Sequence, residues 1–157
     1  MYDITITSEP ARRVVGIEHK GVGTSIGAAF KELWATCGAQ GLWPQVRAVI
    51  AVHFDDPDET PEGECRSLAA VELAGDSVPE GLVEQVLAGG RTAVLTYKGP
   101  YDGLEAAYRY LYGTWLAQAG AVPSGQPPYE IYLNSPEDTA PENLLTAIHV
   151  PLAEAQT

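Results

Sequence analysis

The second half of this 157-residue chain repeats the first half. Residues 13–37 (RVVGIEHKGVGTSIGAAFKELWATC) align with residues 91–115 (RTAVLTYKGPYDGLEAAYRYLYGTW), and Lys20 falls on Lys98, an offset of 78 residues. Further along, the offset becomes 79, where DDPDETPEG from Asp55 is echoed by NSPEDTAPEN from Asn134. A duplicated unit that packs against its copy forms a pseudo-twofold seam, and such seams are favoured places for ligand sites.

Each repeat is predicted to contain a strand, a strand, a helix, a strand and a strand. The strand segments alternate polar and apolar residues or are nearly continuous apolar runs, and the helical segments carry apolar residues at every third or fourth position. The expected strands are residues 3–7, 13–19, 46–54 and 66–73 in the first repeat and 82–87, 91–98, 129–134 and 144–152 in the second.

The expected helices occupy residues 26–37 and about 102–118. Thr24 or Ser25 is suited to cap the start of the first helix, and Gly38 is placed just past its end. Asp102 is the expected cap of the second helix, with a glutamate three residues on, close to a capping box.

The predicted fold is α+β with a mainly antiparallel sheet, because strands outnumber helices and short turns join neighbouring strands. One such hairpin turn is expected at Gly89-Gly90. Both helices are expected on one face of the sheet. Each repeat alone, residues 1–75 or 80–153, has too little core, so residues 1–157 are predicted to form a single domain.

The composition excludes several classes of function. The net charge is −12 with nine basic residues, so direct binding to nucleic acid is not expected, whereas a cationic partner or simple solubility would suit the charge. The start of the chain lacks a signal peptide and no apolar run approaches about 20 residues, which predicts a cytoplasmic protein without membrane spans. The three histidines are scattered and no phosphate-binding glycine loop is present, so neither metal nor cofactor is expected.

Aromatic residues at matching positions of the two predicted helices suggest a ligand site. Phe30 and Trp34 align with Tyr108 and Tyr112. Each of these residues alone is best explained as a helix anchor. A buried hydroxyl needs a partner, however, so several tyrosines on one stripe favour a partly wet groove with aromatic walls.

Glu130 is the most informative single residue. In the strand YEIYLN it shares a face with Tyr132, and the matching face of the first repeat carries Ala51 and His53. If this strand is central, a carboxylate in its middle is costly unless it is paired. If the strand lies at an edge, Glu130 would simply face water.

Three segments resemble the GyrI-like family, also called the AraC-type effector-binding domains, which includes the drug-binding domain of the BmrR type. The segments are DDPDETPEG, GGRTAVLTYKGPYDGL and YEIYLN, and the resemblance covers essentially the whole chain. It implies a bacterial protein with an aromatic pocket at the seam and a glutamate at the pocket floor that accepts lipophilic cations. Glu130 matches that glutamate. No helix-turn-helix precedes the first strand, so the chain resembles the free-standing members.

The resemblance implies three functions. The first is binding of planar, hydrophobic, often cationic molecules, for which the expected residues are Phe30, Trp34, His53, Tyr108, Tyr112, Glu130 and Tyr132. The second is hydrolysis of cyclopropane-bearing genotoxic compounds, in which a desolvated Glu130 with a raised pKa would act as general acid or base and Tyr132 would orient the substrate. The third is binding to DNA gyrase, as in the gyrase inhibitor of this family.

Overall fold

The computed structural model describes residues 2–21, 26–55, 60–75 and 77–153. The chain divides into two compact units, and each repeat contributes to both. Unit 1 consists of Met1–Ala11 and Ala88–Thr157, and unit 2 consists of Arg12–Leu87.

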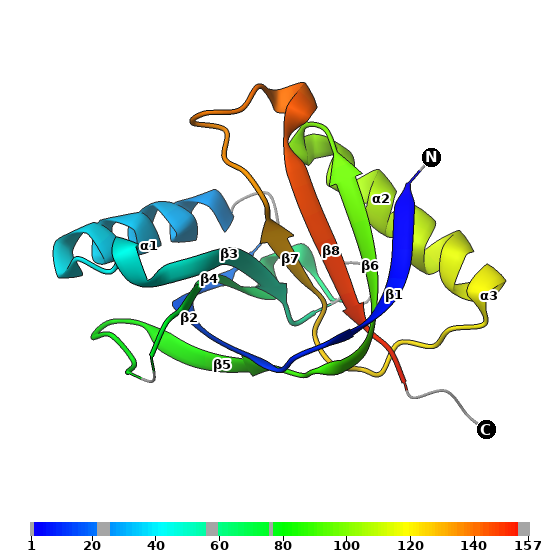
Figure 1. Ribbon diagram of the computed structural model, residues 1–157, viewed down its shortest axis with the longest axis horizontal. Helices are drawn as coiled ribbons and strands as arrows, with labels where there is room; N and C mark the ends of the chain where they lie inside the picture. The colour runs from blue at the N-terminus through cyan, green and yellow to red at the C-terminus, as the bar shows by residue number, and fades with distance from the viewer. Residues whose placement is uncertain (1, 22–25, 56–59, 76, 154–157) are drawn as a thin grey trace. The chain divides into compact units, whose positions relative to one another are not determined.

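Unit 2 is a four-stranded antiparallel sheet with a helix on one face (Figure 1). The strand order is β3-β4-β2-β5. The elements are β2 (Arg12–Lys20), α1 (Gly27–Gln40), β3 (Val46–His53), β4 (Arg66–Leu73) and β5 (Val83–Leu87), with short 3₁₀ turns η2 (Trp43–Gln45) and η3 (Glu62–Glu64). Leu33 and Cys37 of α1 pack against Val15, Ala69 and Val71 of the sheet, and all five are buried.

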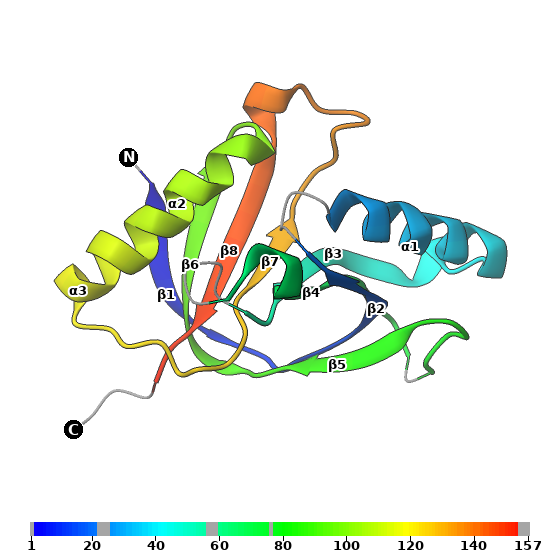
Figure 2. The same ribbon diagram turned by 180° about the vertical axis from the view of Figure 1, so that it is seen from behind.

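Unit 1 has the same construction. Its antiparallel sheet has the order β1-β6-β8-β7, and Figure 2 shows the helical segment lying along this sheet. The strands are β1 (Asp3–Glu9), β6 (Gly90–Lys98), β7 (Tyr129–Tyr132) and β8 (Leu145–Pro151). The helical elements are η4 (Tyr101–Gly103), α2 (Leu104–Tyr110), the π turn η5 (Leu111–Trp115), α3 (Leu116–Ala119) and η6 (Pro141–Asn143). The predicted α+β class, with antiparallel strands and helices, is confirmed.

The first strand of each repeat pairs with the second strand of the other repeat. β1 lies antiparallel to β6, with Asp3 opposite Thr96, and β5 lies antiparallel to β2, with Gly16 opposite Val83. The predicted hairpin at Gly89-Gly90 is therefore wrong, because β5 and β6 have different partners. A Cβ atom on Gly89 would lie 2.5 Å from the Ala11 backbone nitrogen. The glycine at position 89 thus permits a close approach of two backbones.

The first helix extends further than predicted. Thr24 and Ser25, the expected caps, lie outside the described residues. Gly38 does not follow the end of α1 but lies within it, because the helix continues to Gln40 and ends at Gly41, which has the left-handed φ of 65°. The Leu42 amide caps this end of the helix by donating a hydrogen bond to the Cys37 carbonyl over 2.9 Å.

Asp102 does not cap the second helix as predicted. It lies inside the 3₁₀ turn η4, and α2 follows with Gly103 at the N-cap position and no side-chain capping bond there. The turn wraps around Tyr97, whose hydroxyl donates to the Pro100 carbonyl over 2.7 Å. This contact fixes the turn before α2 without capping the helix.

The π turn contains the extra residue that shifts the repeat offset from 78 to 79. In α1 the buried residues Leu33 and Cys37 are four positions apart, whereas their counterparts Leu111 and Leu116 are five positions apart and also buried. A π turn accommodates one additional residue because its hydrogen bonds span five residues in place of four. The second helix therefore keeps its buried stripe despite the insertion.

Candidate ligand-binding site

Glu130 lies buried on β7 with 4% of its surface exposed. Its cross-strand partner is Ile148 of β8, which belongs to the core of unit 1 together with Ala107 and Leu111 of the helical segment. Directly opposed residues of paired strands share a face, so Glu130 faces the helical side of the sheet. The carboxylate thus lies inside unit 1 and is not a water-exposed edge group.

Two tyrosine hydroxyls hold the carboxylate. Tyr108 of α2 donates to Oε2 of Glu130 over 2.6 Å, and Tyr132 of β7 donates to Oε1 over 2.9 Å. Hydrogen bonds to an ionised acceptor are short and stronger than those between neutral groups. The helix and the strand therefore each place one donor on a different oxygen of the same carboxylate.

Two further aromatic rings extend this cluster. Tyr101 contacts Tyr132 edge to face with the ring centroids 5.4 Å apart, and Tyr112 lies nearly parallel to Tyr108 at 6.4 Å and 12°. Tyr112 is 43% exposed, so the cluster leads from the buried carboxylate to the surface. Aromatic faces of this kind attract cations through their negative π surface.

The tyrosines of the cluster have raised pKa values. Burial is the main cause for Tyr108 and Tyr132, whose pKa lies well above 10.0, and the charge of Glu130 and the hydrogen bond to it act in the same direction. Burial, followed by the charge of Glu130, also raises the pKa of Tyr101. All three phenols therefore stay protonated at neutral pH.

This pKa pattern predicts a loss of stability in alkali. Above about pH 10 the unfolded chain releases tyrosine protons that the folded chain retains, so the free energy of unfolding should fall as the pH rises. Tyr108→Phe should show a shallower fall than the parent, which urea unfolding at several pH values would measure. Equal slopes in parent and variant would contradict the assigned environment of Tyr108.

Phe30, Trp34 and His53, the other expected site residues, belong to unit 2. Phe30 contacts Trp34 at 5.5 Å, and Trp34 contacts Trp43 at 5.1 Å. Phe30 and Trp34 are partly buried against the core of unit 2, and His53 lies opposite Ser67 on the paired strands β3 and β4. Their part in ligand binding stays a prediction. In unit 1, by contrast, Glu130, Tyr132, Tyr108 and Tyr112 are brought together.

Sequence profiles identify the family of the chain. The profile of the GyrI-like small molecule binding domain matches residues 2–153. The chain belongs to the GyrI-like family.

Two curated relatives and two solved structures illustrate the range of similar proteins. The GyrI-like chain is 28% identical over 135 residues to the transcriptional regulator BrlR of Pseudomonas aeruginosa, covering 81% of this chain and 47%, about half, of the regulator. It is 25% identical to the DNA gyrase inhibitor of Escherichia coli K12, covering 83% of this chain and 85% of the inhibitor.

The EcmrR C-terminal domain superposes with a TM-score of 0.79 at 18% identity, covering 99% of both chains. SAV2435 bound to tetraphenylphosphonium superposes with a TM-score of 0.63 at 16% identity, covering 98% of this chain and 94% of that one. At these identities the likeness shows a shared GyrI-like fold.

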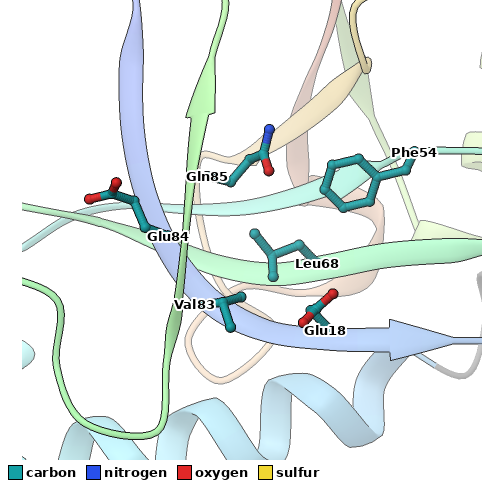
Figure 3. A pocket seen from close by; sticks show the side chains of 6 residues that line it. All are labelled: Glu18, Phe54, Leu68, Val83, Glu84 and Gln85. Atoms are coloured by element: carbon teal, nitrogen blue, oxygen red, sulfur yellow. The ribbon is translucent and has the colours of Figure 1, made fainter.

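A pocket of about 180 Å³ lies elsewhere in the GyrI-like domain, on unit 2. Its lining consists of Glu18, Phe54, Leu68, Val83, Glu84 and Gln85. Figure 3 shows the Glu84 side chain on the far side of β5 from Phe54 and Leu68. Glu84 is paired with Arg13 and 42% exposed, so its charge is both neutralised and solvated. None of the expected site residues lines this pocket.

Tyr101 is the member of the Glu130 cluster that sequence reasoning missed. The signal was present, because Tyr101 in KGPYDG stands where the first repeat has Gly23 in KGVGTS, and a difference between copies points to function.

Within the described ranges no group of three or more potential ligands could hold a metal ion, and no helix there is long and apolar enough to cross a membrane.

Proposed function

We propose that this GyrI-like domain binds hydrophobic, planar, often cationic small molecules at Glu130 and the surrounding tyrosines. The observation that carries the proposal is the buried carboxylate that accepts hydrogen bonds from Tyr108 and Tyr132. These two hydroxyls are neutral, so they satisfy the oxygens without cancelling the negative charge. A cationic ligand would be attracted to that charge.

The expected affinity has three sources. Burial of the apolar parts of the ligand contributes roughly 25 cal/mol per Å² before the costs of association. Each contact between a positive charge and a tyrosine face adds about 0.5–2 kcal/mol. The carboxylate mainly selects the sign of the ligand charge, because a neutral analogue would gain no electrostatic attraction from Glu130.

Ligand entry requires movement of aromatic side chains. Glu130 is 4% exposed and Tyr101 lies edge-on against Tyr132, so very little of the Glu130 side chain faces solvent. Tyr112, already 43% exposed, provides a first surface for a planar ligand. The hydrogen bonds and ring contacts around Glu130 support small-molecule binding directly. Turnover and gyrase binding rest on resemblance alone, so small-molecule binding is favoured.

The test is titration with proflavine, a planar fluorescent cation, followed by fluorescence polarisation. Glu130→Gln keeps the size of the side chain and removes its charge, and it should weaken proflavine binding about tenfold or more. The matched control is Glu105→Gln on α2, which removes the same charge from a side chain that is 81% exposed. The control should bind like the parent, since exposed charges are screened by salt.

Equal binding by Glu130→Gln and the parent would refute the role of the carboxylate. Weakening by both variants would show that proflavine responds only to the net charge of the protein. Turnover needs a separate assay: product formed from a cyclopropane-bearing alkylator in excess, and lost in Glu130→Ala, would replace binding by turnover as the function.

A further inference from the structure

The Thr146 hydroxyl is another buried polar group on the sheet that carries Glu130. Thr146 lies on β8 and is 0% exposed, and its Oγ1 atom has no hydrogen-bond partner among the residues that the structure describes. Buried hydroxyls in native proteins are almost always paired, because an unpaired one loses its hydrogen bonds to water without replacement. An unpaired hydroxyl at this position therefore calls for an explanation.

Thr146 lies beside the Glu130 cluster. In the register of the sheet it stands between Tyr97 on β6 and Tyr132 on β7. Both neighbouring hydroxyls donate elsewhere, Tyr97 to the Pro100 carbonyl and Tyr132 to Glu130. Thr146 is also the diagonal cross-strand neighbour of Glu130 on the same face, a relation that corresponds to about 7–8 Å.

The first repeat carries the same feature at the equivalent position. Ser67 aligns with Thr146 at the offset of 79 residues, is 5% exposed, and its Oγ atom likewise lacks a partner among the described residues. Ser67 lies opposite His53, just as Thr146 lies opposite Tyr132. An unpaired buried hydroxyl thus occurs at the same place in both copies.

We propose that Thr146 is a second polar contact for the ligand and selects among cations. The hydroxyl exchanges a hydrogen bond with a polar atom of the ligand while Glu130 compensates its charge. The preferred class is a hydrophobic cation that also carries an amine, hydroxyl or carbonyl group several ångströms from the centre of charge. This inference rests on the proposed function, because it assumes a ligand at Glu130.

Two cationic probes separate this role from that of Glu130. Proflavine carries amino groups, whereas tetraphenylphosphonium has a positive charge and no hydrogen-bonding group. Thr146→Val keeps the shape of the side chain and removes the hydroxyl. It should weaken proflavine binding about fivefold, the value of one ordinary hydrogen bond, and leave tetraphenylphosphonium binding unchanged in isothermal titration calorimetry. Thr146→Ser, which restores a hydroxyl, should restore proflavine binding.

Thr92→Val provides the matched control. Thr92 on β6 of the same unit is 1% exposed, and its hydroxyl donates to the Gly90 carbonyl over 3.0 Å. Its replacement should lower the urea midpoint of unfolding and leave both probes bound as in the parent. Thr146→Val should instead keep or raise the midpoint, since no hydrogen bond to a described residue is lost.

Three outcomes would overturn the inference. Parent-like proflavine binding by Thr146→Val would show that the hydroxyl does not contact the ligand. Equal weakening of both probes would assign Thr146 a structural role. If neither probe binds the parent, the proposed function fails and the inference fails with it. If Glu130→Gln weakens proflavine binding and Thr146→Val does not, the inference alone fails and the role of Glu130 stands.

Discussion

Deletion of residues 1–11 should abolish the cooperative unfolding transition of unit 1. The deleted segment contains β1, which pairs with β6 from Asp3 opposite Thr96 to Glu9 opposite Gly90. It also contains Tyr2 and Ile4, which pack against the core of unit 1. Lost hydrogen bonds at about 1 kcal/mol each would together approach the 5–15 kcal/mol that stabilises a typical domain.

Circular dichroism during urea unfolding would measure this loss. A synthetic peptide of residues 1–11, added in excess to the shortened chain, should restore part of the transition because the ladder can reform in trans. The expectation is wrong if the shortened chain unfolds at the parent midpoint with the parent steepness. In that case β1 would contribute little to the stability of unit 1.

Gly16→Ala should be among the most destabilising single substitutions in unit 2. A Cβ atom at Gly16 would lie 2.0 Å from the Ala69 carbonyl oxygen and 2.7 Å from the Ala70 Cα atom. Both are backbone atoms in the middle of β4, so β2 and β4 would have to separate. We expect a loss of about 3 kcal/mol or more, read from thermal or urea unfolding.

Gly38→Ala is the control for this substitution. Gly38 lies inside α1, and the nearest atom to an added Cβ is the Trp43 ring nitrogen at 4.0 Å. The helix should gain about 0.5–1 kcal/mol from the lower backbone entropy of alanine in the unfolded chain. The opposite signs of the two glycine substitutions would be hard to explain by a general loss of flexibility. A parent-like Gly16→Ala variant would show that β2 and β4 do not approach as closely as described.

Local patterns in the sequence predicted the elements of the fold better than their partners. β4 occupies Arg66–Leu73, the same residues that its apolar run indicated. The predicted hairpin at Gly89-Gly90 failed because two strands joined by glycines look alike whether they pair with each other or with distant segments. One partner of β6 is β1, whose paired residues lie 81 (Glu9 and Gly90) to 93 (Asp3 and Thr96) positions earlier in the chain, and no local sequence pattern indicates such a distant partner.

Strand alternation and the comparison of the two repeats predicted only part of the site. Alternation placed Glu130 and Tyr132 on one face, and the structure joins them by a hydrogen bond. The bond from Tyr108 depends on how the helix lies over the sheet, which alternation does not describe. Thr146 could not be singled out, because its place opposite Tyr132 follows from the pairing of β7 and β8.

The reciprocal pairing of β1 with β6 and of β5 with β2 bears on the evolutionary origin of this chain. A single repeat cannot pair its own first strand in this way, so a free repeat would need a second copy, as in a homodimer in which two identical chains exchange that strand. Such a dimer must carry every side chain twice. A single chain that contains both repeats is free of that constraint, so one copy can hold alanine at position 51 while the other holds Glu130.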